Sequence, residues 1–227
     1  MQAIILAAGV GSRLGRPFPK SLSVLPDGEK ILGRQIRLLR EAGIASVTVV
    51  VGFKMALIME DFPDVYYSYN PFFYTTNTAK SLACALRRMD DDVIWLNGDV
   101  IFEPGVLRKI LAAPREHLVC VDRKRCAEEE IKYRLDADGK LAALSKTVQN
   151  GEGEALGINL VRRSGLPLFV RCLDACDDMD YFERGLEMMI DQGATVLPLD
   201  ISEFRCLEVD FAADWDLAQK MFAGHSE

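Results

Sequence analysis

The first twenty residues join an apolar segment to a glycine-rich turn, and this combination restricts the fold more than any other feature. Residues 3–6 are short and apolar, which is typical of a buried strand. The sequence AAGVGSRLGRPFPK follows and adds glycines and then cationic side chains. Glycine-rich turns at the carboxyl ends of strands commonly bind phosphate groups through their backbone N–H groups. We therefore expect an α/β fold with a phosphate-binding loop at one edge of its sheet.

Alternating strand and helix patterns along the chain predict a mostly parallel, Rossmann-like sheet. Further strands are expected at 46–51, 65–69, 92–96, 118–122 and 195–200, with a short extended segment at 207–210. Helices are expected at 33–42, 55–61, 78–89, 104–112, 166–175, 181–192 and 212–222. No linker or repeat interrupts this order, so one domain over residues 1–227 is expected.

The pattern changes between residues 126 and 161. Short strand candidates at 132–135, 141–147 and 154–161 are separated by the turn-like sequences DADGK and NGEGE. This arrangement predicts a small mixed or antiparallel insert on the substrate side of the sheet. We expect a nucleotide-binding half over about 1–125 and an acceptor-binding half over about 126–227.

Composition excludes several classes of protein. The net charge of -7 argues against a nucleic-acid binder, which needs a basic face. No apolar run reaches the roughly 18 residues of a membrane span, and the start lacks a basic leader, so a cytoplasmic protein is expected. Six scattered cysteines without a C-x-x-C motif favour reduced thiols. With only two histidines, Ser-His-Asp and histidine–metal chemistry is disfavoured, which leaves carboxylates, lysine and arginine.

Two common phosphate-binding motifs do not fit the opening turn. A P-loop needs a second glycine five positions after the first, but Leu14 and Arg16 occupy that place counted from Gly9 and Gly11. A dinucleotide fingerprint also requires glycine at position 14, and no acidic residue ends the strand at 46–51. A Rossmann oxidoreductase is therefore only a distant alternative.

The sequence LAAGVGSRLGRPFPK resembles the signature of the nucleotidyltransferases that join NTPs to sugar phosphates and related phosphorylated alcohols. The resemblance implies their Rossmann-like, GT-A-like fold. It also implies a catalytic role for Arg13 and Lys20, whose charges suit phosphate oxygens and a reacting α-phosphoryl group. The implied nucleotide-binding loop residues are Leu6, Ala7, Ala8, Gly9, Gly11 and Ser12.

Two aspartates from distant parts of the chain match the metal ligands of that family. Asp99 follows the predicted strand in WLNGDV, and Asp210 ends the sequence LEVD. Two carboxylates can hold one Mg²⁺ together with nucleotide phosphates. A turn residue for Asp99 and a helix N-cap for Asp210 are the alternatives. A phosphate acceptor is already mostly ionised near neutral pH, so no histidine base is required.

The middle of the chain resembles the phosphocholine cytidylyltransferase-like branch of this family. YNPFFYTTNTAKSLACAL carries Asn70, Asn77 and Ser81, which the resemblance assigns to a nucleotide, with CTP favoured. The alternative is that both asparagines only cap turns and a helix. The matching sequence GEALGINLV places Glu154 toward an acceptor.

Further acceptor-binding candidates are Lys146, Tyr181 and Glu183. Phosphocholine, 2-aminoethylphosphonate, a polyol phosphate, an inositol phosphate and a sugar 1-phosphate all stay open as acceptors. We therefore predict a Mg²⁺-dependent cytidylyltransferase with a nucleoside triphosphate and a small phosphorylated acceptor as its partners, compatible with a homo-oligomer. A sugar-1-phosphate nucleotidylyltransferase that uses UTP, GTP or dTTP, and a non-catalytic nucleotide-sensing module, are the alternatives.

Overall fold

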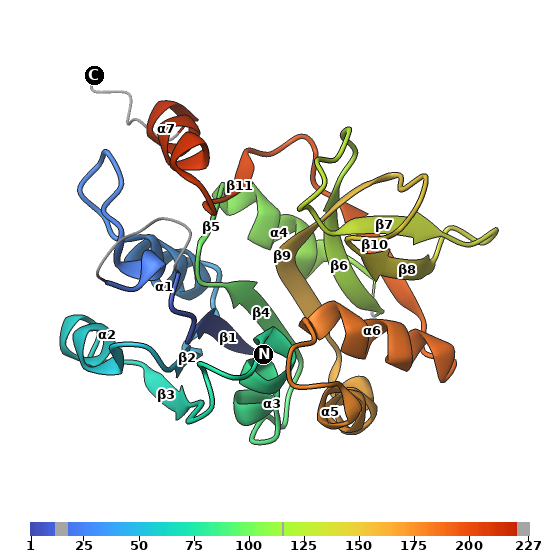
Figure 1. The fold of residues 1–227 in the computed structure, drawn as a ribbon, viewed down its shortest axis with the longest axis horizontal. Helices are drawn as coiled ribbons and strands as arrows, with labels where there is room; N and C mark the ends of the chain where they lie inside the picture. The colour runs from blue at the N-terminus through green and yellow to red at the C-terminus, as the bar shows by residue number, and fades with distance from the viewer. Residues whose placement is uncertain (12–17, 115, 222–227) are drawn as a thin grey trace.

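A twisted sheet with helices on both sides forms the centre of the molecule (Figure 1). The computed structural model describes residues 1–11, 18–114 and 116–221. The strands of the sheet's main path are β1 (Gln2–Ala7), β2 (Ser46–Val51), β3 (Tyr66–Tyr69), β4 (Val93–Asn97), β6 (His117–Asp122), β9 (Gly153–Val161) and β10 (Val196–Asp200). Within the described residues they follow the order β10-β6-β9-β4-β1-β2-β3. Strands β4, β1, β2 and β3 run parallel, as do β6 and β10, so the predicted mostly parallel α/β fold is confirmed.

Alternation of side chains along the strands builds two hydrophobic layers. In β1, Ile4 and Leu6 face one layer, whereas Ala3 and Ile5 face the other. The first layer is closed by α3 (Thr78–Leu86), α5 (Leu166–Ala175) and α6 (Phe182–Asp191). The second is closed by α1 (Ile31–Glu41), α2 (Met55–Asp61) and α4 (Pro104–Ala112). The sheet is therefore covered on both faces, and functional groups lie at the edge where its strands end.

Strand β9 differs from its predicted place in the fold. It lies in the middle of the sheet, antiparallel to both β4 and β6, and all nine of its residues are buried. Only β7 (Lys132–Leu135) and β8 (Leu141–Ser145) form the expected antiparallel insert, as a pair beside β9. Apart from Glu154 and Asn159, β9 consists of apolar residues and glycines, which suits a strand with helices on both faces.

A second, two-stranded sheet joins distant parts of the chain. It pairs β5 (Val100–Phe102) with β11 (Cys206–Glu208) in antiparallel register, and the sequence did not predict β5. The final helix, α7 (Ala212–Met221), follows β11 directly. In the part of the chain that the structure describes, no helix has the length and apolar character needed to cross a membrane. All six cysteines are free thiols.

Candidate active site

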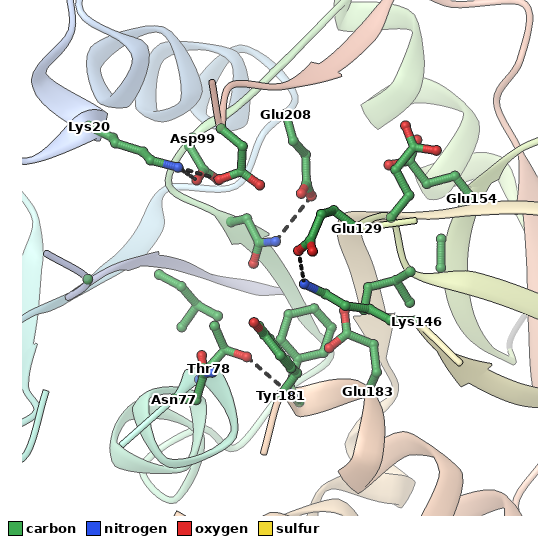
Figure 2. Close-up of a pocket in the computed structure, with 18 of the residues that line it drawn as sticks. Lys20, Asn77, Thr78, Asp99, Glu129, Lys146, Glu154, Tyr181, Glu183 and Glu208 are labelled. Carbon is green, nitrogen blue, oxygen red and sulfur yellow. Dashed lines mark hydrogen bonds and ion pairs between the residues drawn. The ribbon is translucent and has the colours of Figure 1, made fainter. Parts of the chain in front are cut away.

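A pocket of about 480 Å³ opens where β1 and β4 end, within the size range of small-molecule sites (Figure 2). Its walls come from the loop after β1, the start of α3, strand β9, the start of α6 and the segment around β11. The sequence-predicted site residues that line it are Leu6, Ala8, Gly9, Gly11, Lys20, Asn77, Ser81, Asp99, Lys146, Glu154, Tyr181, Glu183 and Asp210. The fold therefore brings candidates from the whole chain to one pocket.

The glycine-rich loop borders the pocket where β1 ends. Gly11 has a φ of 63°, and a side chain there would come within 2.8 Å of the Lys20 Cγ atom, so the close approach of Lys20 requires glycine. Ala7 lines an adjoining cavity of about 170 Å³ rather than the main pocket. Ser12 and Arg13 lie outside the described residues, so their predicted roles stay predictions.

Lys20 forms ion pairs with both predicted metal ligands, and Figure 2 shows its side chain directed toward Asp99. Its Nζ atom is 3.2 Å from Asp99 Oδ2 and also forms an ion pair with Asp210. The β5–β11 sheet explains this convergence, because its register places Glu208 opposite Val100 and the Val209 N–H donates to the Asp99 carbonyl at 3.1 Å. The carboxylates of Asp99 and Asp210, which are 111 positions apart in sequence, thus both contact the Lys20 ammonium group.

The electrostatics of this group favour added positive charge. Burial lowers the pKa of Lys20, but the nearby Asp99 and Asp210 more than offset that effect and raise it. Burial raises the pKa of Asp99, and repulsion from Asp210 adds to the rise while Lys20 opposes it. Among the described residues, one ammonium group contacts two carboxylates here.

The carboxylate pair has the donor chemistry of a Mg²⁺ site, because Mg²⁺ prefers hard oxygen ligands. A divalent cation would also add positive charge beside the two carboxylates. Among the residues that the structure describes, no group of three or more His, Cys, Asp or Glu side chains is arranged to hold a metal. Asp99 and Asp210 thus fit a metal that takes only part of its coordination from the protein.

Glu208 is a buried acid at the centre of the pocket that the sequence analysis did not select. Its Oε1 atom accepts hydrogen bonds from the Gly157 N–H at 2.7 Å and from Asn97 Nδ2 at 3.1 Å. Burial raises the pKa of Glu208 well above its ordinary value, and the neighbouring Asp99 adds to the rise. The sequence could have pointed to Glu208, because it lies two residues before the predicted metal ligand Asp210 in the sequence EVD. Glu208 thus joins the end of β4 to the middle of β9 in the wall of the pocket.

The amide and hydroxyl candidates divide into two roles. Asn70 is buried and does not line the pocket; its Nδ2 atom donates to Ser81 Oγ at 3.0 Å and its Oδ1 atom accepts from the Phe72 N–H at 3.0 Å. The expected direct contact of Asn70 with a nucleotide is therefore corrected to support of Ser81. Asn77 lines the pocket and also caps α3, accepting from the Thr78 N–H at 2.8 Å.

The far end of the pocket is rich in charged groups from the second half of the chain (Figure 2). Lys146 forms an ion pair with Glu129 at 2.9 Å, and its Nζ atom lies 5.2 Å from the centre of the Tyr181 ring. The Thr78 hydroxyl accepts from the Phe182 N–H at 3.0 Å and so ties the start of α6 to the start of α3. This contact fixes the neighbouring residues of α6 against the pocket wall.

Lys124, which the sequence analysis did not select, also lines this end of the pocket. Its Nζ atom is 2.7 Å from Glu154 Oε2 and 3.0 Å from Glu130 Oε1. Burial raises the pKa of Glu154, and the ion pair with Lys124 opposes that rise. A buried carboxylate needs such a partner, which the sequence could not specify.

Comparison with known proteins identifies relatives that are described as nucleotide-transferring enzymes. A family model described as MobA-like NTP transferase domain matches residues 3–191. CMP-5'-(3-aminopropyl)phosphonate synthase of Streptomyces rubellomurinus is 37% identical over 150 residues, which cover 62% of this chain and 24% of that protein. This chain therefore spans only about a quarter of that relative's length.

Two further similarities extend over nearly the whole chain. UTP--glucose-1-phosphate uridylyltransferase AglF of Haloferax volcanii is 27% identical over 243 residues, covering 97% of this chain and 96% of that protein. The structure of the inositol-1-phosphate CTP transferase from T. maritima has a TM-score of 0.81 at 17% identity, covering 98% of this chain and 96% of that one. The structural match supports the fold assignment alone.

Proposed function

Because this chain belongs to the MobA-like NTP transferase family, we propose that it is a Mg²⁺-dependent cytidylyltransferase. It would join CTP to a small phosphorylated or phosphonylated alcohol or amine and release pyrophosphate. The observation that carries this proposal is the convergence of Lys20, Asp99 and Asp210 beside a glycine-rich loop. A non-catalytic nucleotide-sensing module would not need this convergence of one lysine with two carboxylates.

The two ends of the pocket suggest separate sites for the nucleotide and the acceptor. We propose that the half around residues 1–125 holds the nucleotide, and that the half around 126–227 holds the acceptor. Asp99 and Asp210 would hold Mg²⁺, which when bound would offset charge on the nucleotide phosphates. Lys20 would stabilise the α-phosphoryl group from the same side. Glu154 and Lys146 line the opposite end, where an acceptor would approach.

The proposed reaction needs no proton-accepting side chain. An oxygen of the acceptor's phosphate or phosphonate dianion attacks the α-phosphorus of CTP, and the bond from that phosphorus to the pyrophosphate oxygen breaks. The acceptor is already ionised near neutral pH, since a phosphate monoester has a second pKa of about 6. The protein's task is then to position the partners and to neutralise charge. This requirement agrees with a pocket lined by lysines and carboxylates and without histidine among its described residues.

CTP is the favoured donor because the relative with 37% identity is described as making a CMP conjugate. Asn77 and Ser81 line the pocket one helical turn apart, and both could read the polar edge of a base. UTP is the second candidate, because the relative described as a uridylyltransferase covers 97% of this chain. We also infer a cytoplasmic location, which agrees with six free cysteines.

A pyrophosphate-release assay with four NTPs and a panel of acceptors tests the proposal. We expect turnover with CTP and Mg²⁺, loss of turnover with EDTA, and recovery when Mg²⁺ is added back. Asp99→Asn should abolish most turnover and also the stabilisation against heat that CTP and Mg²⁺ together provide. Turnover with UTP but not CTP would support the second candidate. Absence of pyrophosphate release with every pair of NTP and acceptor would refute the proposed activity.

A further inference from the structure

Glu183 carries an unsatisfied carboxylate oxygen at the acceptor end of the pocket. The residue is only 7% exposed, and its Oε2 atom has no hydrogen-bond partner among the described residues. Glu183 lines the pocket, and Figure 2 shows its carboxylate on the side of Tyr181 and Lys146. Leaving a buried carboxylate oxygen without a donor is costly. A donor supplied by a ligand would remove that cost.

The charges around Glu183 define what kind of donor fits. Four glutamates line this end of the pocket, namely Glu129, Glu130, Glu154 and Glu183, against the two lysines Lys124 and Lys146. Lys124 is paired with Glu130 and Glu154, and Lys146 is paired with Glu129. Glu183 is left without an ion-pair partner within the described parts of the chain. The surplus of negative charge opposes a purely anionic acceptor and favours a cationic group on it.

We propose that the acceptor carries an ammonium group with N–H donors, and that Glu183 binds this group beside the ring of Tyr181. This inference rests on the proposed function and names the substrate class: ω-amino phosphates or phosphonates. The acceptor's anionic end would then point toward Lys20 and the carboxylate pair, while its cationic end would lie at the start of α6. Such an acceptor matches both ends of the pocket in charge.

A primary ammonium group fits this site better than a trimethylammonium group. A quaternary nitrogen has no N–H donor, so it cannot satisfy the Oε2 atom of Glu183. Quaternary groups are typically held by several aromatic faces. Tyr181 offers one ring, and the Lys146 ammonium group already lies 5.2 Å from its centre. Burial also raises the pKa of Glu183 to about 7, which is consistent with a carboxyl group in need of a cationic partner.

Matched acceptors in the CTP assay test this inference. We would compare 2-aminoethyl phosphate, choline phosphate and 2-hydroxyethyl phosphate, which share a two-carbon chain and a phosphate. The primary amine should exceed the hydroxyl analogue in kcat/KM by about 10- to 100-fold, the range expected for one hydrogen bond to a charged group. Choline phosphate should fall between them, because it keeps the positive charge but lacks the donor.

Glu183→Gln provides the decisive variant. It should reduce the amine-to-hydroxyl ratio of kcat/KM to near one, through a higher KM for the amine, and leave the KM for CTP within about twofold. Glu187→Gln is the matched control on the next turn of the same helix, because its side-chain carbonyl can still accept from the Leu144 N–H, as Glu187 does at 3.0 Å. The control should keep the wild-type ratio.

The outcomes separate this inference from the proposed function. Equal use of the amine and hydroxyl acceptors by the wild type, or an unchanged ratio in Glu183→Gln, would overturn the ammonium site and leave the nucleotidyltransferase proposal standing. No transfer of a nucleotide from any of the four NTPs to any acceptor would overturn both. If Glu183→Gln fails to fold, Tyr181→Leu decides, since this residue is 38% exposed and its side chain makes no cap hydrogen bond. An undiminished amine preference in Tyr181→Leu would then refute the site.

Discussion

Replacing Glu183 with glutamine should raise the free energy of unfolding, relative to the wild type, by more at pH 8 than at pH 5. Burial raises the pKa of this carboxyl group from 4.5 to about 7 in the folded state. The folded protein therefore binds more protons than the unfolded chain between these values, and the free energy of unfolding falls as the pH rises through this window. The full difference corresponds to about 3 kcal/mol, since one pKa unit is about 1.4 kcal/mol.

Urea unfolding of the wild type and Glu183→Gln at pH 5 and pH 8 measures this effect. Ionisation of Glu183 already costs the wild type part of its stability at pH 5. The difference in unfolding free energy between the variant and the wild type should therefore increase by about 2.5 kcal/mol from pH 5 to pH 8. Other titrating groups are common to both proteins and cancel in the comparison. The unpaired amide of glutamine adds a constant that does not depend on pH. A gap that is the same at both pH values would refute the assignment of a strained, buried carboxylate at position 183.

Three further outcomes are expected. Lys20→Ala should lower kcat by about 10²- to 10³-fold while far-UV circular dichroism stays unchanged, and a near wild-type rate would remove Lys20 from the mechanism. Gly157→Ala would place a methyl group 2.3 Å from Glu208 Oε1 and 2.4 Å from Asn97 Nδ2, so urea unfolding should show a loss of about 1–3 kcal/mol. The urea midpoint should not change when a reducing agent is added, because all six cysteines are free, and a shift would contradict that state.

The order of strands and helices was predictable because each element carries its own period. Met55–Asp61 and Pro104–Ala112 have the predicted bounds, since proline or a turn marks their beginnings. The position of β9 was not predictable, because a short apolar strand has the same local pattern at the centre of a sheet as in an insert. Three-residue β5 was missed for a related reason: its strand character comes from pairing with β11, more than a hundred positions later.

The candidate site likewise contains residues that local sequence predicts and residues that only tertiary contacts reveal. Lys20 and Asp99 were recognisable from local motifs, and the structure brings them together. Glu208 and Lys124 were not selected, because their importance depends on burial and on partners from other parts of the chain. Asn70 had the right local sequence but faces Ser81 instead of the pocket. Motifs thus indicate chemistry, while the direction of each side chain is decided by tertiary packing.

The central position of β9 has a consequence for acceptor length. Glu154 lies at the far end of the pocket and Gly157 contacts Glu208 at its centre, so three steps along one strand span about 10 Å between them. Pairing with β6 at residues 154 and 155, and with β4 from residue 158 onward, holds the two ends of this segment in the sheet. If the acceptor binds as proposed, a chain with one methylene too many or too few would not be matched by a change in that spacing. Discrimination between homologous chains would then come from a single rigid backbone segment, independent of any flexible lid.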